Sequence, residues 1–258
     1  MKTLLDSKNK IIDIIFPFIS ILIAFLVWFI TASVVNAEII LPSPTQTFKE
    51  LFKVLGEKEF YLAVGGTLFR AIISFLISYL LAFIIAVLSA KFNVVKRLTY
   101  PLIVIARGIP TMSVILICYL AVSPKISPIL IACLVILPLA YNEILSNLTS
   151  VDNNVIEACN VYGVSKNKVF KQYVLPLVLE KSFISAITLL AFSVKLTISA
   201  EAVIYTTNSL GLLMQVSKTA LQTGRLFAYT LIAVLIGALL ELIAVILKNK
   251  FKGGNSND

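Results

Sequence analysis

The sequence has no histidine and only three cysteines among its 258 residues. Without histidine, the chain has neither the usual general base of enzymes nor the ligands of an HExxH zinc site. The cysteines, Cys118, Cys133 and Cys159, form no CxxC pair, so we predict no metal in this chain and no disulfide framework. There is also no GxSxG motif and no pair of intramembrane aspartates, which argues against an intramembrane enzyme.

Charge is scarce as well. Only 14% of the residues are charged, whereas 59% are hydrophobic and the mean hydropathy is +0.98. Soluble domains have about 45–50% apolar and about 25% charged residues, so this composition predicts an all-α polytopic membrane protein. The net charge of +9 fits basic residues collected in cytoplasmic loops, and no basic patch interleaved with aromatics points to nucleic acid.

Long apolar runs predict the membrane spans, because a spanning helix needs about 20 mainly apolar residues. Six runs satisfy this requirement: Ile11–Val35, Tyr61–Ala90, Thr99–Val122, Ile126–Leu148, Leu175–Ile204 and Leu226–Leu247. The first run is longer than the 7–15 apolar residues of a signal peptide, so we expect it to remain as a span. We therefore divide the chain into an N-terminus (1–10), a membrane domain (11–248) and a disordered tail (249–258).

Lysine and arginine predict the orientation, because they are enriched on the cytoplasmic side. With the N-terminus inside, twelve lie in cytoplasmic segments: Lys2, Lys8, Lys10, Lys91, Lys96, Arg97, Lys166, Lys168, Lys171, Lys248, Lys250 and Lys252. Six lie outside: Lys49, Lys53, Lys58, Lys125, Lys218 and Arg225. The excess predicts that both termini are cytoplasmic.

Two outside segments are more than simple turns. In the first, four apolar residues have the spacing of one helix face: Phe48, Leu51, Phe52 and Leu55. This amphipathic helix either lies on the membrane surface or packs on the outer ends of the spans. The second segment, residues 205–224, is expected to be a loop or a short helix.

One polar stretch interrupts the apolar runs on the cytoplasmic side. Asp152, Asn153 and Asn154 are good N-cap residues for a helix that Gly163 can end with a positive φ. Ser165 can then cap a second helix.

That second helix is expected over Lys166–Tyr173, with Pro176 at the start of the following span. The pair, at about residues 152–173, has too few apolar residues for a core of its own: Val155, Ile156, Cys159, Val161, Tyr162, Val169, Phe170 and Tyr173. It is either a plain hairpin or a corner with one face on the membrane domain and another face for a partner.

The same stretch resembles the EAA motif of the permease subunits of ATP-binding-cassette (ABC) importers: Glu-Ala-Ala, three residues, Gly, nine residues, Ile-x-Leu-Pro. The matching residues are Glu157, Ala158, Gly163, Leu175 and Pro176, whereas Cys159 replaces the second alanine and Tyr173 the isoleucine. Further similarity to the subfamily that imports nitrate, sulfonates, taurine and thiamine precursors lies in "LPSPTQTF" (41–48), "RGIP" (107–110), "VKLTISAEAV" (194–203), "SLGLLM" (209–214) and "FAYTLIAVLIGALLE" (227–241).

The resemblance implies a type I ABC-importer permease fold in the bacterial cytoplasmic membrane. It implies a second permease copy, an ATPase dimer that grips the helix pair, and an extracytoplasmic solute-binding protein. The ATPase-coupling residues would be Glu157, Ala158, Cys159, Gly163, Leu175 and Pro176. The chain contains no GxxxxGK[ST] phosphate loop, so ATP would be bound by the partner subunit and no cofactor by this chain.

Charges within the apolar runs are candidates for the solute pathway, because they are costly in the membrane. We single out Arg107, Lys195 and Glu201 as pathway-lining candidates, and Arg107 or Lys195 in the pathway would favour an anionic solute. The alternative for Arg107 and Lys195 is a buried ion pair with Glu201 or Glu143. Other charges near span ends, Arg70, Lys181 and Glu241, can reach the interface along their side chains.

The competing class is a secondary transporter with its own ion coupling. Such a protein would carry an internal repeat, and we find none with a period of 20–50 residues. The spacing of Glu157–Pro176 has no role in that class.

Overall fold

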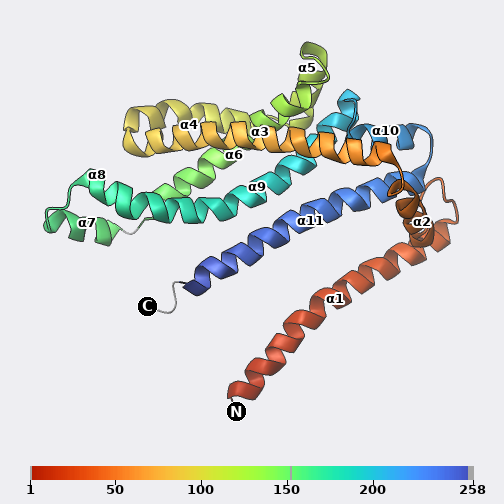
Figure 1. Ribbon diagram of the computed structural model, residues 1–258, viewed down its shortest axis with the longest axis horizontal. Coiled ribbons are helices and arrows are strands. Elements are labelled where there is room, and N and C mark those ends of the chain that lie inside the picture. The colour runs from red at the N-terminus through yellow and green to blue at the C-terminus, as the bar shows by residue number, and fades with distance from the viewer. Residues whose placement is uncertain (1, 152, 255–258) are drawn as a thin grey trace. The chain divides into compact units, whose positions relative to one another are not determined.

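The computed structural model describes the backbone of residues 2–151 and 153–254. It describes the side chains of most, but not all, of these residues. Its helices are α1 Lys2–Val35, α2 Pro44–Val54, α3 Lys58–Lys91, α4 Asn93–Gly108, α5 Thr111–Ala121, α6 Ser127–Thr149, α7 Asn153–Val161, α8 Lys166–Val169, α9 Leu175–Ile204, α10 Leu210–Thr219 and α11 Thr223–Gly254 (Figure 1). A π-helical turn, η1, covers Phe170–Val174 between α8 and α9. No strand occurs in the described ranges, and 86% of the chain is helical, which confirms the predicted class.

In the part of the chain that the structure describes, five helices are long and apolar enough to cross a membrane: α1, α3, α6, α9 and α11. The predicted third span differs from the expectation of one straight helix. It consists of α4 and α5, which meet at a 90° bend. The break falls at Ile109-Pro110, because a residue before proline is pushed out of the helical region and Ile109 is extended at φ −73° and ψ 124°.

The chain forms two compact units, and unit 1 comprises residues 1–57 and 216–231. Helix α2 begins where Ser43 accepts a hydrogen bond from the backbone N–H of Gln46 at 3.2 Å, with Pro44 at the first helical position. Its buried side holds Thr47 and Val54, while Phe52 of the predicted apolar face is 73% exposed. This exposed apolar face is what a helix on the membrane surface presents.

Two longer-range contacts hold unit 1 together. The indole N–H of Trp28 on α1 donates to the backbone oxygen of Pro42 at 3.1 Å, and the indole ring stacks on Phe227. The guanidinium of Arg225 forms an ion pair with Glu57. These contacts tie α1 and the segment after α10 to the α2 region.

Unit 2, residues 58–215 and 232–258, contains the core around α3, α6 and α9 (Figure 1). Small residues on α3 let the neighbouring helices approach closely. Ala71, Ser74, Ser78, Ala82 and Ala86 are fully buried on that face. Direct bonds cross the interfaces: the hydroxyl of Ser193 donates to the oxygen of Ala71 at 2.8 Å, and that of Ser78 donates to the oxygen of Cys133 at 3.3 Å.

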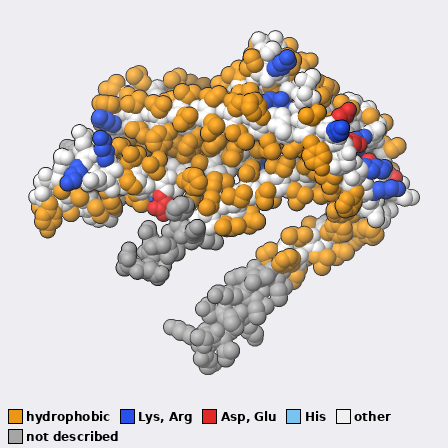
Figure 2. All heavy atoms as spheres, viewed as in Figure 1, with side chains coloured by type: hydrophobic (Ala, Val, Ile, Leu, Met, Phe, Trp, Pro, Cys, Tyr) orange, Lys and Arg blue, Asp and Glu red, His pale blue; other side chains and the backbone are white. Residues whose placement is uncertain are grey.

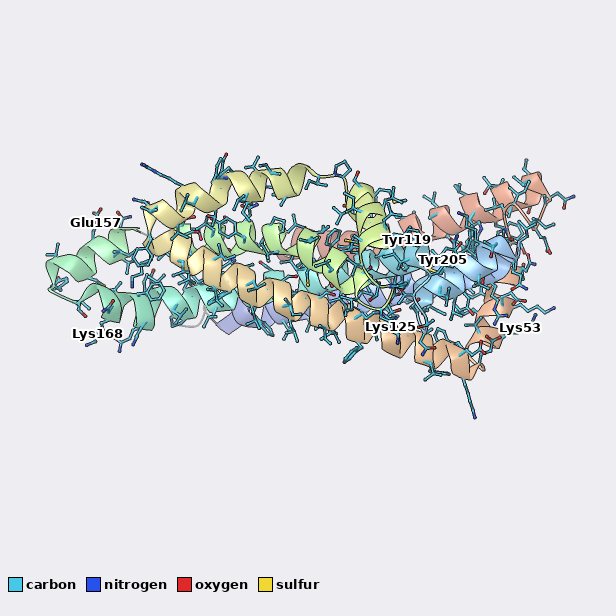
Figure 3. All side chains as sticks on the ribbon, turned by 90° about the horizontal axis from the view of Figure 1, so that it is seen from above. Lys53, Tyr119, Lys125, Glu157, Lys168 and Tyr205 are labelled. Carbon is cyan, nitrogen blue, oxygen red and sulfur yellow. The ribbon has the colours of Figure 1, made fainter. Side chains whose placement is uncertain are left out.

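Figure 2 shows where the charges of unit 2 lie. Hydrophobic side chains cover the middle of this unit, while basic side chains gather at the end that carries α7 and α8. Figure 3 places Glu157 and Lys168 at that end and Tyr119, Lys125 and Tyr205 far from it. The residues after Gly254 and Asp152, one of the proposed N-caps, lie outside the described residues. Of the predicted tail, residues 249–254 continue α11.

Candidate functional site

The site expected from the sequence is the corner made by α7, Gly163 and α8 (Figure 3). Gly163 has a φ of +72°, the left-handed region that glycine adopts most readily. The backbone N–H of Val164 donates to the oxygen of Cys159 at 2.9 Å, the six-residue bond of a Schellman helix end. The predicted glycine turn is therefore formed, and it closes α7 by hydrogen bonding within the corner.

After the turn, the chain enters α8 as predicted, but the second helix does not stop. The oxygen of Ser165 accepts bonds from the backbone N–H groups of Lys168 and Val169 at 2.9 and 3.1 Å. Helix α8 then passes through η1 into α9 without a break. The sequence analysis expected a separate helix over Lys166–Tyr173 and missed this continuity.

Proline gives the physical reason for the π turn. Pro176 lies at the start of α9, has no N–H to donate, and its ring crowds the carbonyl four residues earlier. A π turn directly before it widens the helix, with the N–H of Leu175 donating to the oxygen of Phe170, five residues back. The Leu-Pro pair therefore ends the wide turn.

One face of the corner packs on the membrane domain. Val169 and Val174 belong to a buried cluster with residues of α3 and α6, and several partly buried side chains add to it: Ile156, Cys159, Val164, Phe170 and Tyr173. The cluster includes Ala82 and Ile144, which are both fully buried. This packing fixes the corner to the ends of the core helices.

The other face is exposed. Val161 and Tyr162, which the sequence analysis counted only among the apolar residues of the pair, are 84% and 85% exposed at its tip. Glu157 and Ala158 are exposed beside them, and Glu157 has no ion-pair partner among the described side chains. Val161 and Tyr162 therefore give this short helix pair an exposed, apolar tip.

The charges proposed for the pathway lie in different places. Arg107 is exposed in the last turn of α4, at the bend before α5. Lys195 is exposed on α9, and its ammonium lies 2.9 Å from the carboxylate of Glu241 on α11. Glu201 is fully buried, and its partner is Arg70 at 2.7 Å rather than Arg107 or Lys195.

Glu201 is the centre of a buried polar cluster that the sequence did not reveal. One carboxylate oxygen accepts from Nε of Arg70, and the other accepts from the hydroxyl of Thr67 at 2.7 Å. The hydroxyl of Thr67 in turn accepts from the N–H of Leu210 at 2.9 Å, and Arg70 donates to the oxygen of Asn208 at 2.8 Å. The cluster thus fastens the start of α10 to α3 and α9, with a negative charge at a helix N-terminus.

Comparison with known proteins agrees with this fold. The chain belongs to the family of binding-protein-dependent transport system inner membrane components, whose family model matches residues 78–253. It is therefore the permease subunit of an ABC importer, a multi-pass protein of the inner membrane.

Among solved structures, a chain from inward-facing conformations of the MetNI methionine ABC transporter is similar with a TM-score of 0.63. The two sequences are 15% identical, and the match covers 75% of this chain and 98% of that chain. At this identity the likeness shows the fold, a type I ABC-importer permease. No curated protein matches the sequence.

Proposed function

We propose that the α7–Gly163–α8 corner is the ATPase-coupling element of this permease. The observation that carries the proposal is the exposure of Val161 and Tyr162 on a corner whose other face is packed on the core. A groove on a separate ATP-binding subunit would cover these side chains. Glu157 and Ala158 border the tip, so a small side chain at 158 allows close approach and the carboxylate offers a charge to the partner.

The family to which the chain belongs supports our proposal for the rest of the assembly. Two permease copies form one solute pathway, an ATPase dimer drives it, and an extracytoplasmic solute-binding protein delivers the solute. The corner and both termini face the cytoplasm, which the basic side chains gathered around α7 and α8 support. The solute is a small molecule, an anion such as a sulfonate or nitrate or a thiamine-precursor-like vitamin, according to the subfamily that the sequence resembles.

Substitution at the tip tests the coupling role. We expect Tyr162→Asp and Ala158→Trp to abolish ATP-driven uptake, because one introduces a charge into the interface and the other a bulky ring. Both variants should still insert in normal amounts, since neither side chain is buried in the chain. Co-purification of the ATPase subunit with the tagged permease measures docking directly.

The matched control is Tyr205→Asp, because Tyr205 is also an exposed tyrosine, 49% exposed, and lies after the predicted fifth span and far from the corner (Figure 3). We expect this variant to retain the ATPase. If the Tyr162 and Ala158 variants kept both the ATPase and uptake at the wild-type rate, the coupling assignment would be wrong. Uptake without any ATPase, driven by an ion gradient, would instead support a secondary transporter.

A further inference from the structure

Helix α9 carries a polar face along much of its length. Its members follow one another at spacings of three, four and seven residues, which places them on one side of the helix. We call this set the α9 polar face: Lys181, Ser185, Thr188, Lys195 and Ser199. All are exposed except Ser185, which is half-buried.

The other sides of α9 are different. Ala191, Val194 and Ile198 are buried against the core of unit 2. In the first half of the helix, Leu179 and Phe183 are each 49% exposed, and both lie away from the polar face by helical geometry. Helix α9 therefore has a packed side, an apolar exposed side and a polar exposed side.

Neighbouring helices add carboxylates next to the polar face. The hydroxyl of Ser185 donates to Glu143 on α6 at 2.9 Å, one turn from Lys181. Lys195 lies 2.9 Å from Glu241, and these two side chains remain 55% and 52% exposed. The face and its neighbours thus carry two lysines and two glutamates, with a net charge of zero.

Gly237 gives Lys195 the room to lie along α11. A Cβ at position 237 would be 3.1 Å from Cε of Lys195, which is tighter than nine in ten real Cβ contacts. The lysine stem therefore passes over the glycine to reach Glu241, one turn further along α11.

Charged side chains in spanning helices face other protein or a water-filled cavity, because lipid does not solvate them. The Lys195–Glu241 pair is half-exposed, so each group keeps unused hydrogen-bonding capacity: an ammonium has three donors and a carboxylate about four acceptor sites. A simple anion gains little from a lysine that a carboxylate already neutralises. A solute with both charges can bond to the lysine with one end and to the glutamate with the other.

We propose that the α9 polar face, together with Glu143 and Glu241, is a wall of the solute pathway, and that it accepts a small solute carrying both a cationic and an anionic group. This inference rests on the proposed transport function and narrows its solute class. It does not depend on how the ATPase is coupled, so experiments can contradict the pathway wall and the coupling role separately.

Cysteine accessibility tests the wall. In a chain with Cys118, Cys133 and Cys159 replaced by alanine, single variants Ser185→Cys, Thr188→Cys and Ser199→Cys are assembled with their partner subunits in membrane vesicles. A charged, membrane-impermeant methanethiosulfonate should modify them at least about tenfold faster than the controls Leu179→Cys and Phe183→Cys, since thiolates form in water and not in lipid.

Equal rates at the two sets of positions would overturn the wall. The proposal would also be wrong if the cysteines of the α9 polar face stayed unmodified but formed disulfides between two permease copies. That result would show that this face is an interface between the copies. Because modification needs no ATP hydrolysis, a failed coupling assignment leaves this result readable.

Protection of the reactive cysteines tests the solute class. The probes are matched pairs with chains of two, three and four carbons: 2-aminoethanesulfonate with 2-hydroxyethanesulfonate, and ω-amino with ω-hydroxy carboxylates. At about twice its dissociation constant, a bound zwitterion should slow modification by about threefold. Its hydroxy partner, a simple anion, should not protect.

If the anions protected the cysteines as well as the zwitterions do, the proposed zwitterionic solute class would be wrong. It would also be wrong if none of the probes protected them. As a second readout, Glu241→Gln removes the negative partner of Lys195. The zwitterion should lose its advantage over the anion in this variant. An unchanged preference would exclude the pair as the recognition element.

Discussion

Nε of Arg70 lies 2.7 Å from the carboxylate of Glu201, and this pair joins two core helices where the side chains are 13% and 0% exposed. Removal of one partner leaves a buried charge without compensation, which costs about 3–5 kcal/mol. We therefore expect Arg70→Gln and Glu201→Gln each to lower the yield of folded permease sharply. Fluorescence-detected size-exclusion chromatography with a thermal ramp measures the loss.

The double variant Arg70→Gln/Glu201→Gln is the control for that prediction. It removes both charges and keeps side chains that hydrogen-bond, so most of the stability should return. A double variant as unstable as the sum of the two single variants would contradict the ion-pair explanation.

Alanine substitution at two adjacent glycines of α3 should change the stability of the protein in opposite directions. A Cβ at Gly66 would overlap the carbonyl oxygen of Asn208, a backbone atom that cannot swing aside, whereas a Cβ at Gly65 has nothing within 4 Å. We expect Gly66→Ala to destabilise the protein by about 1–3 kcal/mol. Gly65→Ala should stabilise it by about 0.5–1 kcal/mol, because alanine favours a helix interior. Equal melting temperatures for the two variants would contradict this close approach.

A Cβ at Gly163 would have no atom within 4 Å, so space does not limit substitution there. The effect of a substitution should depend on how readily the new residue adopts the left-handed backbone region. Asparagine adopts that region more readily than most residues and valine does not. We expect Gly163→Asn to retain most ATP-driven uptake and Gly163→Val to lose most of it. Both variants should insert normally, which immunoblots of membranes can check. Equal activity would mean that the φ of +72° is unimportant for coupling.

The π turn predicts the effect of removing one residue. A π turn takes up one extra residue, so deletion of Gln172, an exposed residue of η1, would leave a regular α-helix with nearly the same orientation of the corner relative to α9. We expect insertion and ATPase binding to be retained. Gln172→Ala keeps the length and should behave as wild type. A deletion variant that inserts but loses the ATPase would show that the wide turn itself is needed for docking.

Much of the fold could be predicted because it depends on local composition. Apolar runs gave the spans, and the Gly163 turn followed from a residue type suited to its φ. The bend between α4 and α5 was missed although Pro110 was visible, because hydropathy averages across a break and ignores backbone geometry. The continuous path through η1 was missed because a π turn has no clear signal in a single sequence.

The ion pairs could not be predicted because they depend on which helix faces lie together. Arg70 and Glu201 are 131 residues apart, and only the packing of α3 on α9 brings them together. The sequence identified Glu201 as a costly intramembrane charge but offered no way to choose its partner. The same holds for Lys195 and Glu241, which belong to different helices.

The uninterrupted helix from Asn167 to Ile204 is 38 residues long, or about 57 Å at the α-helical rise, nearly twice the thickness of the bilayer core. If the proposed coupling end is gripped by the ATPase, such a rod would work as a lever arm whose pivot is the packed region around Val178 and Ile144. Val178 lies about 16 Å from the gripped end at the α-helical rise, so a shift of about 5 Å there would tilt the rod by about 17°. Such a swing moves the two ends of the rod in opposite directions, so one stroke can narrow one mouth of a pathway while it widens the other.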